Sequence, residues 1–410
     1  MYDAIVVGAR CAGSPTAMLL AHKGYRVLLV DKSTFPSDIM SSHMVWQPGI
    51  AQLKRWGLLD TVVASQCPPI RQVTFDVGAF ALTGTPPPAE GVADAYAPRR
   101  KVLDTILVEA ARAAGAEVRE DFSVQEVLLD HDHATGIRGR ARRGTPVTEH
   151  ARLIIGADGA HSLVARTVQA PAYHTQPPLA CWYYTYWSGV PTAGAEVYPR
   201  DGRFIACQPT HDGLVCITLG WTYKEFRTFR ADIAGNYRKT LDLAPALAAR
   251  VDEGKREERF VGTADVPNFF RKPYGPGWAL VGDAGYHKDP VTAQGMTDAF
   301  RDAEWLAEAI DAGFAGRQSL AEALADYQRR RDTAVLPMYE YTCQLASLAP
   351  PPPDMQQLFT ALRGNQHETN RHFGTIAGTV PIPEFFSPEN LERIMGAAGK
   401  DGGCARAETV

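Results

Sequence analysis

The chain has 410 residues, of which 45% are hydrophobic and 21% are charged, and its formal net charge at pH 7 is -4. A chain of this length and composition can bury a large hydrophobic core and is expected to form about two or three packing units. Its negative net charge argues against a nucleic-acid partner. The seven cysteines form no C-x-x-C pair and no His/Cys pair lies at ligand spacing, which indicates a reducing compartment and no metal site. There is neither a charged leader before an apolar stretch nor a run of about 18 apolar residues, so we expect a cytoplasmic protein without a membrane span.

Residues 1–31 are predicted to form a βαβ unit. The apolar runs 4–7 and 27–30 are typical of short buried strands, residues 17–21 form the helix body, and Gly24 ends the helix. A glycine turn joins the first strand to the helix, as in folds that bind a dinucleotide.

This glycine turn, residues 8–13, is similar to the G-x-G-x-x-G fingerprint. Gly8 allows the tight turn, Gly13 lets helix and strand approach, and Asp31 lies at about the 20-residue distance of a ribose contact. Arg10 replaces the middle glycine, and we expect its guanidinium to face phosphate or flavin. The turn predicts a site for NAD or FAD, or else is an ordinary βα turn. Its candidate contacts are Gly8, Arg10, Cys11, Ala12, Gly13, Asp31 and Lys32.

A second α/β stretch follows. Residues 103–114 are predicted to form a helix that Gly115 ends, and strands are predicted at 117–118 and 153–155. The last strand leads into a Gly-Ala-Asp-Gly turn that contains Asp158, and this turn alone indicates no more than a change of direction.

Two β-rich stretches, residues 71–98 and 176–262, are broken by Pro and Gly, and we predict that they form one sheet domain inserted into the α/β domain. Aromatic residues crowd the first strand of the second stretch. Alternation places Trp182, Tyr184 and Tyr186 on one face, where they either line an aromatic pocket that binds substrate or form sheet core.

A third apolar strand, residues 279–281, ends in a Gly-Asp turn at Asp283. An acidic side chain there can bind a sugar-chain hydroxyl, and a helix starting near Gly295 would aim its positive end at the turn, which suits a reduced flavin. The candidate cofactor contacts are Asp283, Pro290, Gln294, Gly295 and Met296. A long helical region follows Thr297, up to a proline run at 350–353 that marks a boundary.

The ordered set of motifs resembles the class A flavoprotein monooxygenases and their relatives, the geranylgeranyl-reductase-like enzymes and the flavin-dependent halogenases. These families carry a glycine fingerprint, a G-A-D-G-x-x-S-x-x-R run and a G-D-A run in that order, and the likeness covers roughly residues 1–340. The stretch that starts at Arg100 is similar to their R-x-x-L-D-x-x-L helix start. The resemblance implies FAD as cofactor, with Gly8, Gly13, Asp31, Arg100 and Asp283 as contacts and Asp158 nearby.

The departures from the family pattern are informative. The Asp289-Pro290 step resembles the reductase and halogenase branches more than the simple phenol hydroxylases. The W-x-W-x-I-P run of halogenases is absent, and no second glycine fingerprint for a nicotinamide occurs.

Two histidines are candidate catalytic residues. His43 lies in the stretch where the resembling families approach the isoalloxazine ring, and His287 lies between Asp283 and Asp289 in the loop over the flavin. Each is predicted to act as a base or a substrate hydrogen-bond donor, or else to make a polar contact that only holds a loop.

We therefore predict an α/β fold with a Rossmann-like FAD-binding domain, an inserted β-sheet substrate domain and a helical C-terminal region. The boundaries are 1–71, 98–175 and 263–349 for the FAD-binding domain, 72–97 and 176–262 for the substrate domain, and 350–410 for the C-terminal helical segment and flexible tail.

The predicted function is that of an FAD-dependent monooxygenase that hydroxylates an aromatic or polycyclic small molecule through a flavin C4a-hydroperoxide. Its partners would be this substrate, molecular oxygen, and NADH, NADPH or a separate flavin reductase as electron source. One alternative is an FAD-dependent reductase or dehydrogenase of the geranylgeranyl-reductase type, without oxygen insertion. Another is a flavin-binding carrier or sensor without turnover, against which the large aromatic insert argues. The oligomeric state is left open.

Overall fold

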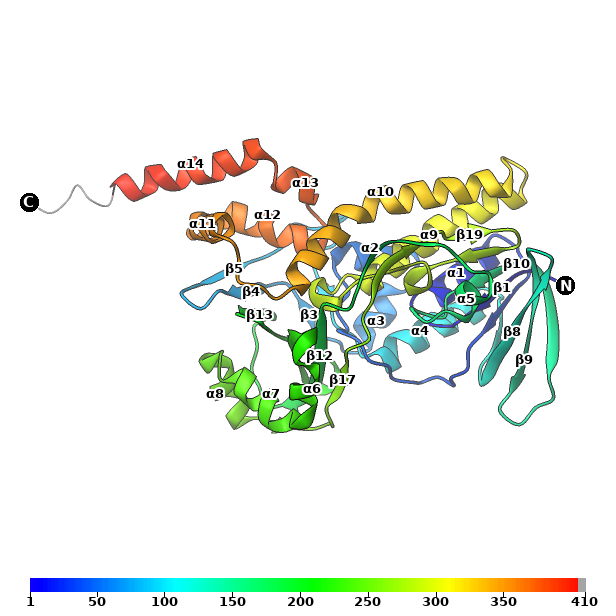
Figure 1. Ribbon diagram of the computed structural model, residues 1–410, viewed down its shortest axis with the longest axis horizontal. Coiled ribbons are helices and arrows are strands. Elements are labelled where there is room, and N and C mark those ends of the chain that lie inside the picture. Colours follow the sequence, from blue (N-terminus) through cyan, green and yellow to red (C-terminus); the bar gives the residue numbers. More distant parts are fainter. Residues whose placement is uncertain (405–410) are drawn as a thin grey trace, which may run out of the picture.

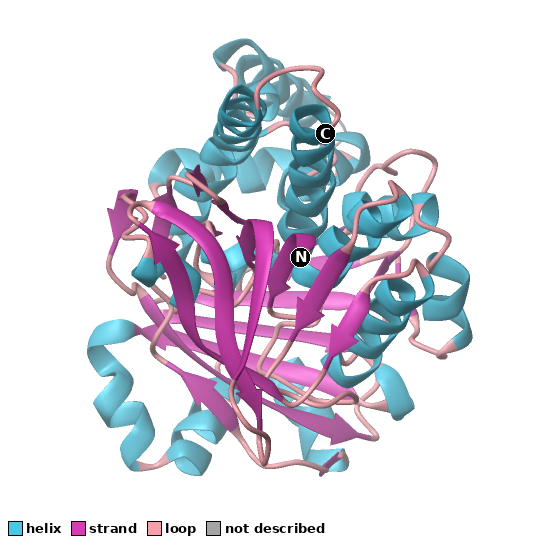
Figure 2. Ribbon diagram, turned by 90° about the vertical axis from the view of Figure 1, so that its right-hand side faces the viewer, coloured by secondary structure: helices cyan, strands magenta, loops and turns pink. Residues whose placement is uncertain are grey.

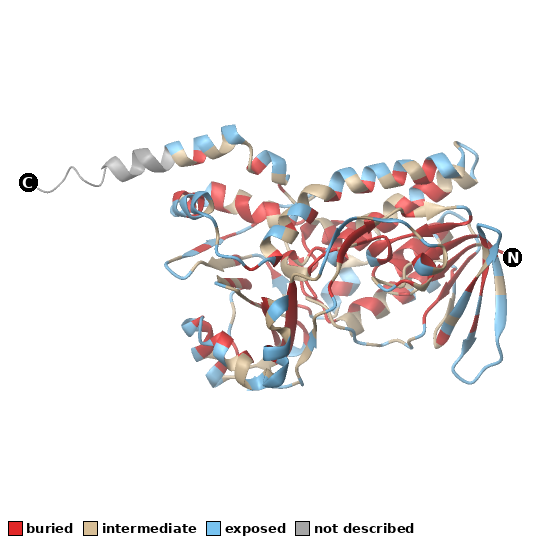
Figure 3. Ribbon diagram, in the orientation of Figure 1, coloured by how far each residue is buried: buried red, intermediate tan, exposed pale blue. Residues whose placement is uncertain are grey.

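The computed structural model describes the backbone of residues 1–404 and the side chains of residues 1–396. The molecule is elongated, and helix α14 (Pro388–Cys404) leaves the body at the end opposite the N-terminus (Figure 1). Buried residues concentrate along the middle, whereas the hairpin of β8 (Phe122–Asp130) and β9 (His133–Ala141) is largely exposed at its tip (Figure 3). No helix among the described residues is long and apolar enough to cross a bilayer.

A mostly parallel sheet forms one half of the body, because its central strands are short apolar runs that need cover on both faces. Its order is β19-β20-β10-β1-β2-β7. These strands are β1 (Tyr2–Val7), β2 (Val27–Val30), β7 (Glu117–Arg119), β10 (Val147–Gly156), β19 (Tyr274–Gly275) and β20 (Trp278–Leu280). Helices α1 (Gly13–His22), α4 (Arg100–Ala113) and α9 (Gly295–Phe314) pack on one face, and the β8–β9 hairpin with α5 (Leu163–Thr167) packs on the other.

A second sheet has the order β16-β12-β15-β14-β13-β4-β5, with β17 paired to β12. These strands are β4 (Val73–Asp76), β5 (Ala81–Gly84), β12 (Ala180–Ser188), β13 (Ala195–Arg200), β14 (Arg203–Pro209), β15 (Val215–Thr222), β16 (Lys255–Arg256) and β17 (Val261–Thr263). A parallel pair of β4 and β13, with Val73 opposite Ala195, joins the two chain segments that build this sheet. Figure 2 shows the strands of both sheets with helices around them.

Smaller elements complete the body. They are the pair β3 (Pro69–Ile70) and β6 (Ala95–Tyr96), the sheet of β11 (Ala172–Gln176), β18 (Asn268–Arg271) and β21 (Tyr286–His287), and helices α2 (Gln47–Arg55), α3 (Leu59–Ala64), α10 (Leu320–Ala346), α11 (Pro353–Leu362), α12 (Gln366–Ala377) and α13 (Ile382–Phe385). Four short 3-10 turns lie at His211–Gly213, Tyr223–Glu225, Gly282–Ala284 and Pro290–Thr292. The C-terminal helices pack on β4 and β5 through a cluster that includes Leu82, Phe373 and Phe385.

The predicted α/β class with a Rossmann-like sheet is confirmed, but the stretch 176–262 is less uniformly β-rich than predicted. It contains the helices α6 (Phe226–Ala231), α7 (Ile233–Leu241) and α8 (Pro245–Glu253). In α7, Ile233, Tyr237 and Leu241 recur every four residues and pack on the sheet. Asp232 caps this helix by accepting a backbone hydrogen bond at 2.9 Å, a start signal that the prediction did not use.

The C-terminal tail also differs from the prediction. Helix α14 continues through the glycines at 402 and 403 to Cys404, because extending a formed helix by one residue costs far less than starting one. The remainder of the predicted flexible tail, residues 405–410, lies outside the described residues. The domain boundaries stay a prediction.

Candidate functional site

Three turns that the sequence singled out lie at one edge of the parallel sheet. Val7 of β1 is opposite Gly156 of β10, which is opposite Leu280 of β20. Backbone hydrogen bonds extend this register into the turns, from Ala157 to Val7 at 2.8 Å and from Val281 to Gly156 at 2.9 Å. Because α/β sheets bind nucleotides at the carboxyl ends of their strands, the three turns form one candidate site.

The glycine turn leaves no space for a side chain at its first and last positions. Gly8 has a φ of +105°, and a Cβ there would lie 2.4 Å from the carbonyl oxygen of Ala157. A Cβ at Gly13 would lie 1.8 Å from the carbonyl oxygen of Gly8. The turn therefore closes tightly against α1, whose first backbone N–H groups can bind an anion.

A cavity of about 1520 Å³ opens at this edge and continues to the second sheet and the C-terminal helices. A pocket for one small molecule measures about 300–1,000 Å³, so this cavity has room for a cofactor and a second molecule. The predicted site residues that line it are Gly8, Arg10, Cys11, Ala12, Asp31, Lys32, Arg100, Asp158, Trp182, Tyr184, Asp283, His287, Pro290, Gly295 and Met296. Gly13, His43, Tyr186 and Gln294 do not line it.

Asp31 lies at the end of β2, beside the glycine turn. Its Oδ2 accepts a hydrogen bond from the backbone N–H of Ala9 at 2.7 Å, and its Oδ1 accepts one from Ser33 at 2.7 Å. Each carboxylate oxygen can accept more than one hydrogen bond. A ribose hydroxyl can therefore still donate to Asp31, and the exposed Lys32 lies next to it on the cavity wall.

Asp104 of α4 organises the cofactor side of the cavity, although the sequence analysis did not assign it a contact. Its fully buried carboxylate accepts hydrogen bonds from Arg10 at 2.5 Å, Arg100 at 3.0 Å and the Cys11 thiol at 3.4 Å. Arg10 also donates to the hydroxyl of Ser37 at 3.2 Å. The structure holds the Arg10 guanidinium on Asp104 and the loop after β2, with Arg10 on the cavity wall, so its predicted contact with phosphate or flavin stays a prediction. The signal for Asp104 was its place in the R-x-x-L-D run.

Asp158 and Asp283 follow the second and third strands of the site and differ in how they are held. Asp158 caps α5, because its Oδ2 accepts from the backbone N–H of Leu163 at 2.6 Å, and burial raises its pKa. Its Oδ1 is buried without a hydrogen-bond partner among the described residues. The Asp283 side chain is exposed on the cavity wall, where its carboxylate can accept a hydrogen bond from a ligand hydroxyl.

The start of α9 is open toward the cavity. A Cβ at Gly295 would meet no atom within 4 Å, and Pro290 and Met296 lie on the same wall. Gln294 points elsewhere, since its amide donates to the carbonyl of Ile376 in α12. Its interaction with α12 explains why Gln294, predicted as a cofactor contact, is absent from the cavity wall.

His43 and Tyr186 form a buried pair that does not line the cavity, although the neighbouring Tyr184 does. The Nε2 atom of His43 is hydrogen-bonded to the Tyr186 hydroxyl, and the Arg99 guanidinium lies 4.0 Å from the centre of the Tyr186 ring. Burial lowers the pKa of His43 to about 3, so its imidazole is neutral. The sequence could not show that this histidine turns into the protein instead of toward the cavity.

Trp182 and Asp289 meet on the cavity wall. The indole of Trp182 donates to Oδ2 of Asp289 at 3.2 Å, and Val291 donates its backbone N–H to Oδ1 at 3.0 Å. Burial raises the pKa of Asp289 to about 7. A carboxyl of this kind can hold or release a proton near neutral pH, which makes Asp289 a candidate that the sequence analysis did not assign.

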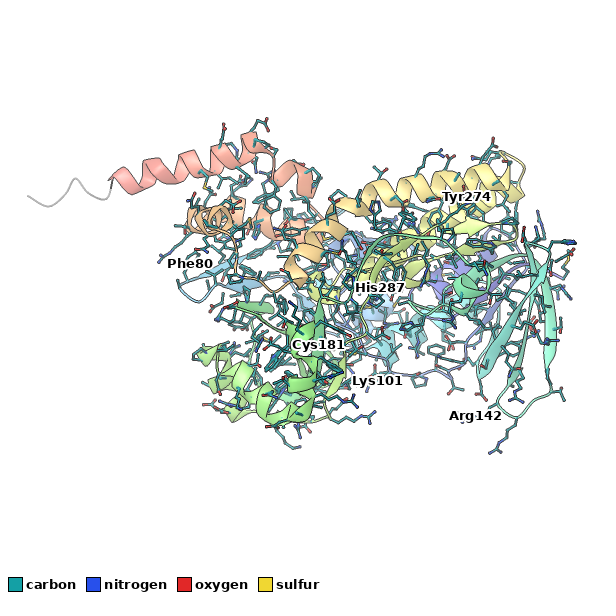
Figure 4. All side chains as sticks on the ribbon, viewed as in Figure 1. Phe80, Lys101, Arg142, Cys181, Tyr274 and His287 are labelled. Carbon is teal, nitrogen blue, oxygen red and sulfur yellow. The ribbon has the colours of Figure 1, made fainter. Side chains whose placement is uncertain are left out.

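His287 lies on β21, near the centre of the molecule in Figure 4 and on the cavity wall. Its Nδ1 donates to the carbonyl of Pro267, and its ring stacks on Phe269 at a centroid distance of 5.8 Å. Since a carbonyl only accepts, Nδ1 carries a proton and Nε2 is left for a partner in the cavity.

Comparison with known proteins indicates which nucleotide this site takes. The chain matches the FAD binding domain family over residues 1–340. It belongs to this family. The flavoprotein is thus an FAD-dependent oxidoreductase, as its motifs imply.

The flavoprotein is 26% identical to a digeranylgeranylglycerophospholipid reductase from Methanocella arvoryzae, over 73% of its own length and 74% of the relative. Its structure is similar to that of a myxobacterial chondrochloren halogenase, with a TM-score of 0.78, 21% identity, and coverage of 97% and 96% of the two chains. PqsL of Pseudomonas aeruginosa, a probable FAD-dependent monooxygenase, gives a TM-score of 0.69 and 20% identity, with coverage of 91% and 98%. These structural likenesses show a shared fold.

The residues present fit FAD. The glycine turn and the start of α1 suit a pyrophosphate, Asp31 suits a ribose hydroxyl, and Asp283 suits a hydroxyl of the flavin's sugar chain. The open start of α9 at Gly295 suits the negative charge of a reduced flavin ring. Each of these individual contacts is a prediction.

Proposed function

We propose that the flavoprotein is an FAD-dependent monooxygenase that hydroxylates an aromatic or polycyclic small molecule. The observation that carries this proposal is one continuous cavity, which reaches from the glycine turn to a wall of aromatic side chains. Trp182 and Tyr184 of β12 and Phe204 of β14 belong to this wall, so an aromatic ring system would bury its faces against other rings. A protein that only stored FAD would not need this second compartment.

Reduced FAD, when bound, supplies the activation of molecular oxygen, and the chain provides binding, orientation and proton handling. The apolar walls exclude water and hold the substrate ring against the cofactor. His287 and Asp289 lie in the same loop region of the cavity wall. Nε2 of His287 is placed to accept a proton from a substrate hydroxyl, and the Asp289 carboxyl, with its pKa raised to about 7 by burial, can hold one.

The electron source in this proposal is NADH, NADPH or a separate flavin reductase. The sequence has no second glycine fingerprint for a nicotinamide, so a nicotinamide would bind transiently without a dedicated Rossmann unit. Stopped-flow reduction of the bound FAD by NADH, by NADPH and by a flavin reductase with free reduced flavin would identify the donor.

A reductase that saturates a C=C bond without inserting oxygen is the second candidate. It is favoured by the 26% identity to a digeranylgeranylglycerophospholipid reductase over most of both chains. The same apolar cavity would then hold an isoprenoid chain, and molecular oxygen would be no substrate.

The deciding experiment uses ¹⁸O₂. The FAD-loaded protein is supplied with an electron donor and a panel of phenols, polycyclic aromatics and isoprenoids, and the products are analysed by mass spectrometry. Incorporation of one ¹⁸O atom into an aromatic product is the expected result. A product that gains two hydrogens without ¹⁸O, formed equally well under nitrogen, would refute the monooxygenase and support the reductase.

A further inference from the structure

The cavity wall formed by the C-terminal helices contains a histidine that the site described above does not use. His372 lies on α12, is only 3% exposed, and lines the cavity. Its Nδ1 atom is buried without a hydrogen-bond partner among the described residues. Nδ1 has no surface open to the cavity, so Nε2, which also has no hydrogen-bond partner among the described residues, is the nitrogen that a ligand can reach. A polar nitrogen at an apolar wall favours a ligand group that can pair with it.

The surroundings of His372 are aromatic. Phenylalanine ring centroids lie 5.5 to 6.4 Å from that of the imidazole, and they belong to Phe75, Phe359, Phe373, Phe385 and Phe386. All of these except Phe385 also line the cavity, together with Met355, Ile376 and Ile382. This part of the wall is therefore mostly apolar rings, with the imidazole of His372 among them and the phenol of Tyr341 beside Phe386.

The imidazole of His372 is neutral. Burial alone lowers its pKa to about 4, and no charged side chain contributes to the shift. A neutral imidazole offers one N–H donor and one nitrogen acceptor. A hydroxyl group can donate to Nε2 or accept from it, depending on the tautomer, whereas a carboxylate or ammonium would be buried here without a counter-charge, which is strongly unfavourable.

We propose that His372 recognises a hydroxyl group on the aromatic substrate, so that the substrate class is a hydroxylated aromatic compound bound between the phenylalanine rings and the flavin side of the cavity. The proposal rests on the proposed function, because it takes the second molecule in the cavity to be an aromatic substrate. Figure 1 shows α12 well apart from α1, and residues of α12 and of the glycine turn before α1 both line the cavity, so the recognised hydroxyl and the glycine turn would belong to different walls.

Binding to the oxidised, FAD-loaded protein tests this proposal by calorimetry with three probes: 2-naphthol, naphthalene and 2-naphthoate. The wild-type protein is expected to bind 2-naphthol about 10-fold more tightly than naphthalene, and 2-naphthoate more weakly than 2-naphthol. His372→Phe is expected to abolish the preference for 2-naphthol, and His372→Gln to keep part of it because an amide can still pair with a hydroxyl. His367→Gln is the matched control, since His367 is an exposed histidine of the same helix, and it should behave as wild type.

Equal binding of 2-naphthol and naphthalene by the wild-type protein would overturn the proposal, as would a preference that survives in His372→Phe or tightest binding of 2-naphthoate. The wild-type comparison needs no variant, so a variant that fails to fold leaves the proposal testable. No electron donor is present, so oxygen chemistry plays no part in the result. Intact selectivity for 2-naphthol without ¹⁸O incorporation would count against the monooxygenase alone, and oxygen insertion without selectivity would count against His372 alone.

Discussion

At the cofactor end of the cavity, charged side chains are tied to one another around Asp104, whereas at α12 a neutral imidazole lies among phenylalanine rings. The first arrangement fixes the shape of a loop and leaves backbone N–H groups and carboxylates to the ligand. The second leaves an imidazole without a hydrogen bond among the described residues, in a mostly apolar wall. Under the two proposals above, a rigid polar frame would bind the cofactor, while shape and a hydrogen bond to His372 would select the substrate.

Replacing Asp104 is expected to have the largest effect, because the polar frame depends on it. Asp104→Asn removes the charge that pairs with Arg10 and Arg100, and leaves two largely buried guanidinium groups without their partner. Breaking a buried pair in this way costs about 3–5 kcal/mol of unfolding free energy, and FAD affinity should fall as well. Urea unfolding and FAD titration would measure both.

The control for this variant is Asp242→Asn, which breaks a half-exposed pair with Arg238. It should cost less than about 1 kcal/mol. If the two variants lost equal stability, Asp104 would be no more important to the fold than a surface ion pair.

Replacing Asp283 tests a predicted hydrogen bond between the cofactor end of the cavity and FAD. Asp283→Ala should weaken FAD binding by about 10- to 100-fold, because a hydrogen bond to a charged group contributes about 1.5–3 kcal/mol. Protein stability without FAD should change little, since this side chain is exposed. Asp201→Ala, at another exposed aspartate, is the control. Unchanged FAD content after dialysis would contradict the assignment.

Asp289, on the cavity wall beside Trp182, is expected to make stability depend on pH. Burial raises its pKa from 3.8 to about 7, so between these values the folded protein holds a proton that the unfolded chain has released. The free energy of unfolding should therefore fall as pH rises through this range, by at most about 1.4 kcal/mol per pH unit from this group. Asp289→Asn should remove that contribution.

Thermal or urea unfolding of wild type and Asp289→Asn at a series of pH values from 4 to 8 would isolate the effect. The difference between the two curves cancels His43 and His372, whose lowered pKa values make stability rise with pH over part of the same range. Parallel curves would show that Asp289 is ionised in the folded protein throughout.

Replacing His287 is expected to give the smallest change. The variant distinguishes a catalytic role of this side chain from a role that only holds the loop. His287→Ala should keep FAD bound but slow oxygen transfer by at least about 10-fold, with more hydrogen peroxide released per electron donor oxidised. The competing interpretation is that its hydrogen bond to Pro267 only holds the loop, which predicts a joint loss of FAD, melting temperature and activity. Those three quantities should be measured on the same variant. Normal turnover with normal coupling would exclude a catalytic role.

Among the predicted site residues, the sequence predicted which ones line the cavity more completely for the cofactor contacts than for the catalytic and substrate residues, for physical reasons. Gly8 and Gly13 are required by backbone contacts within a short turn, so a local pattern predicts them. His43 and His287 have similar sequence contexts, yet one turns into a buried pair with Tyr186 and the other lines the cavity. The position of His43 depends on Tyr186 of β12, 143 residues away in sequence, and that of His287 on contacts to Pro267 and Phe269, which no local motif predicts. His372 had no motif at all, and only burial among rings from four separate segments makes it a candidate.

The family match ends at residue 340, while His372 and most of the phenylalanine rings around it lie beyond that point, after the proline run at 350–353. If His372 recognises the substrate as proposed, part of substrate selection lies outside the stretch that matches the family. Substitutions in α11 to α13 would then change which compounds are accepted without altering the glycine turn or α4. A search for new substrates should therefore diversify the cavity-lining residues of these helices first and leave the glycine turn and α4 unchanged.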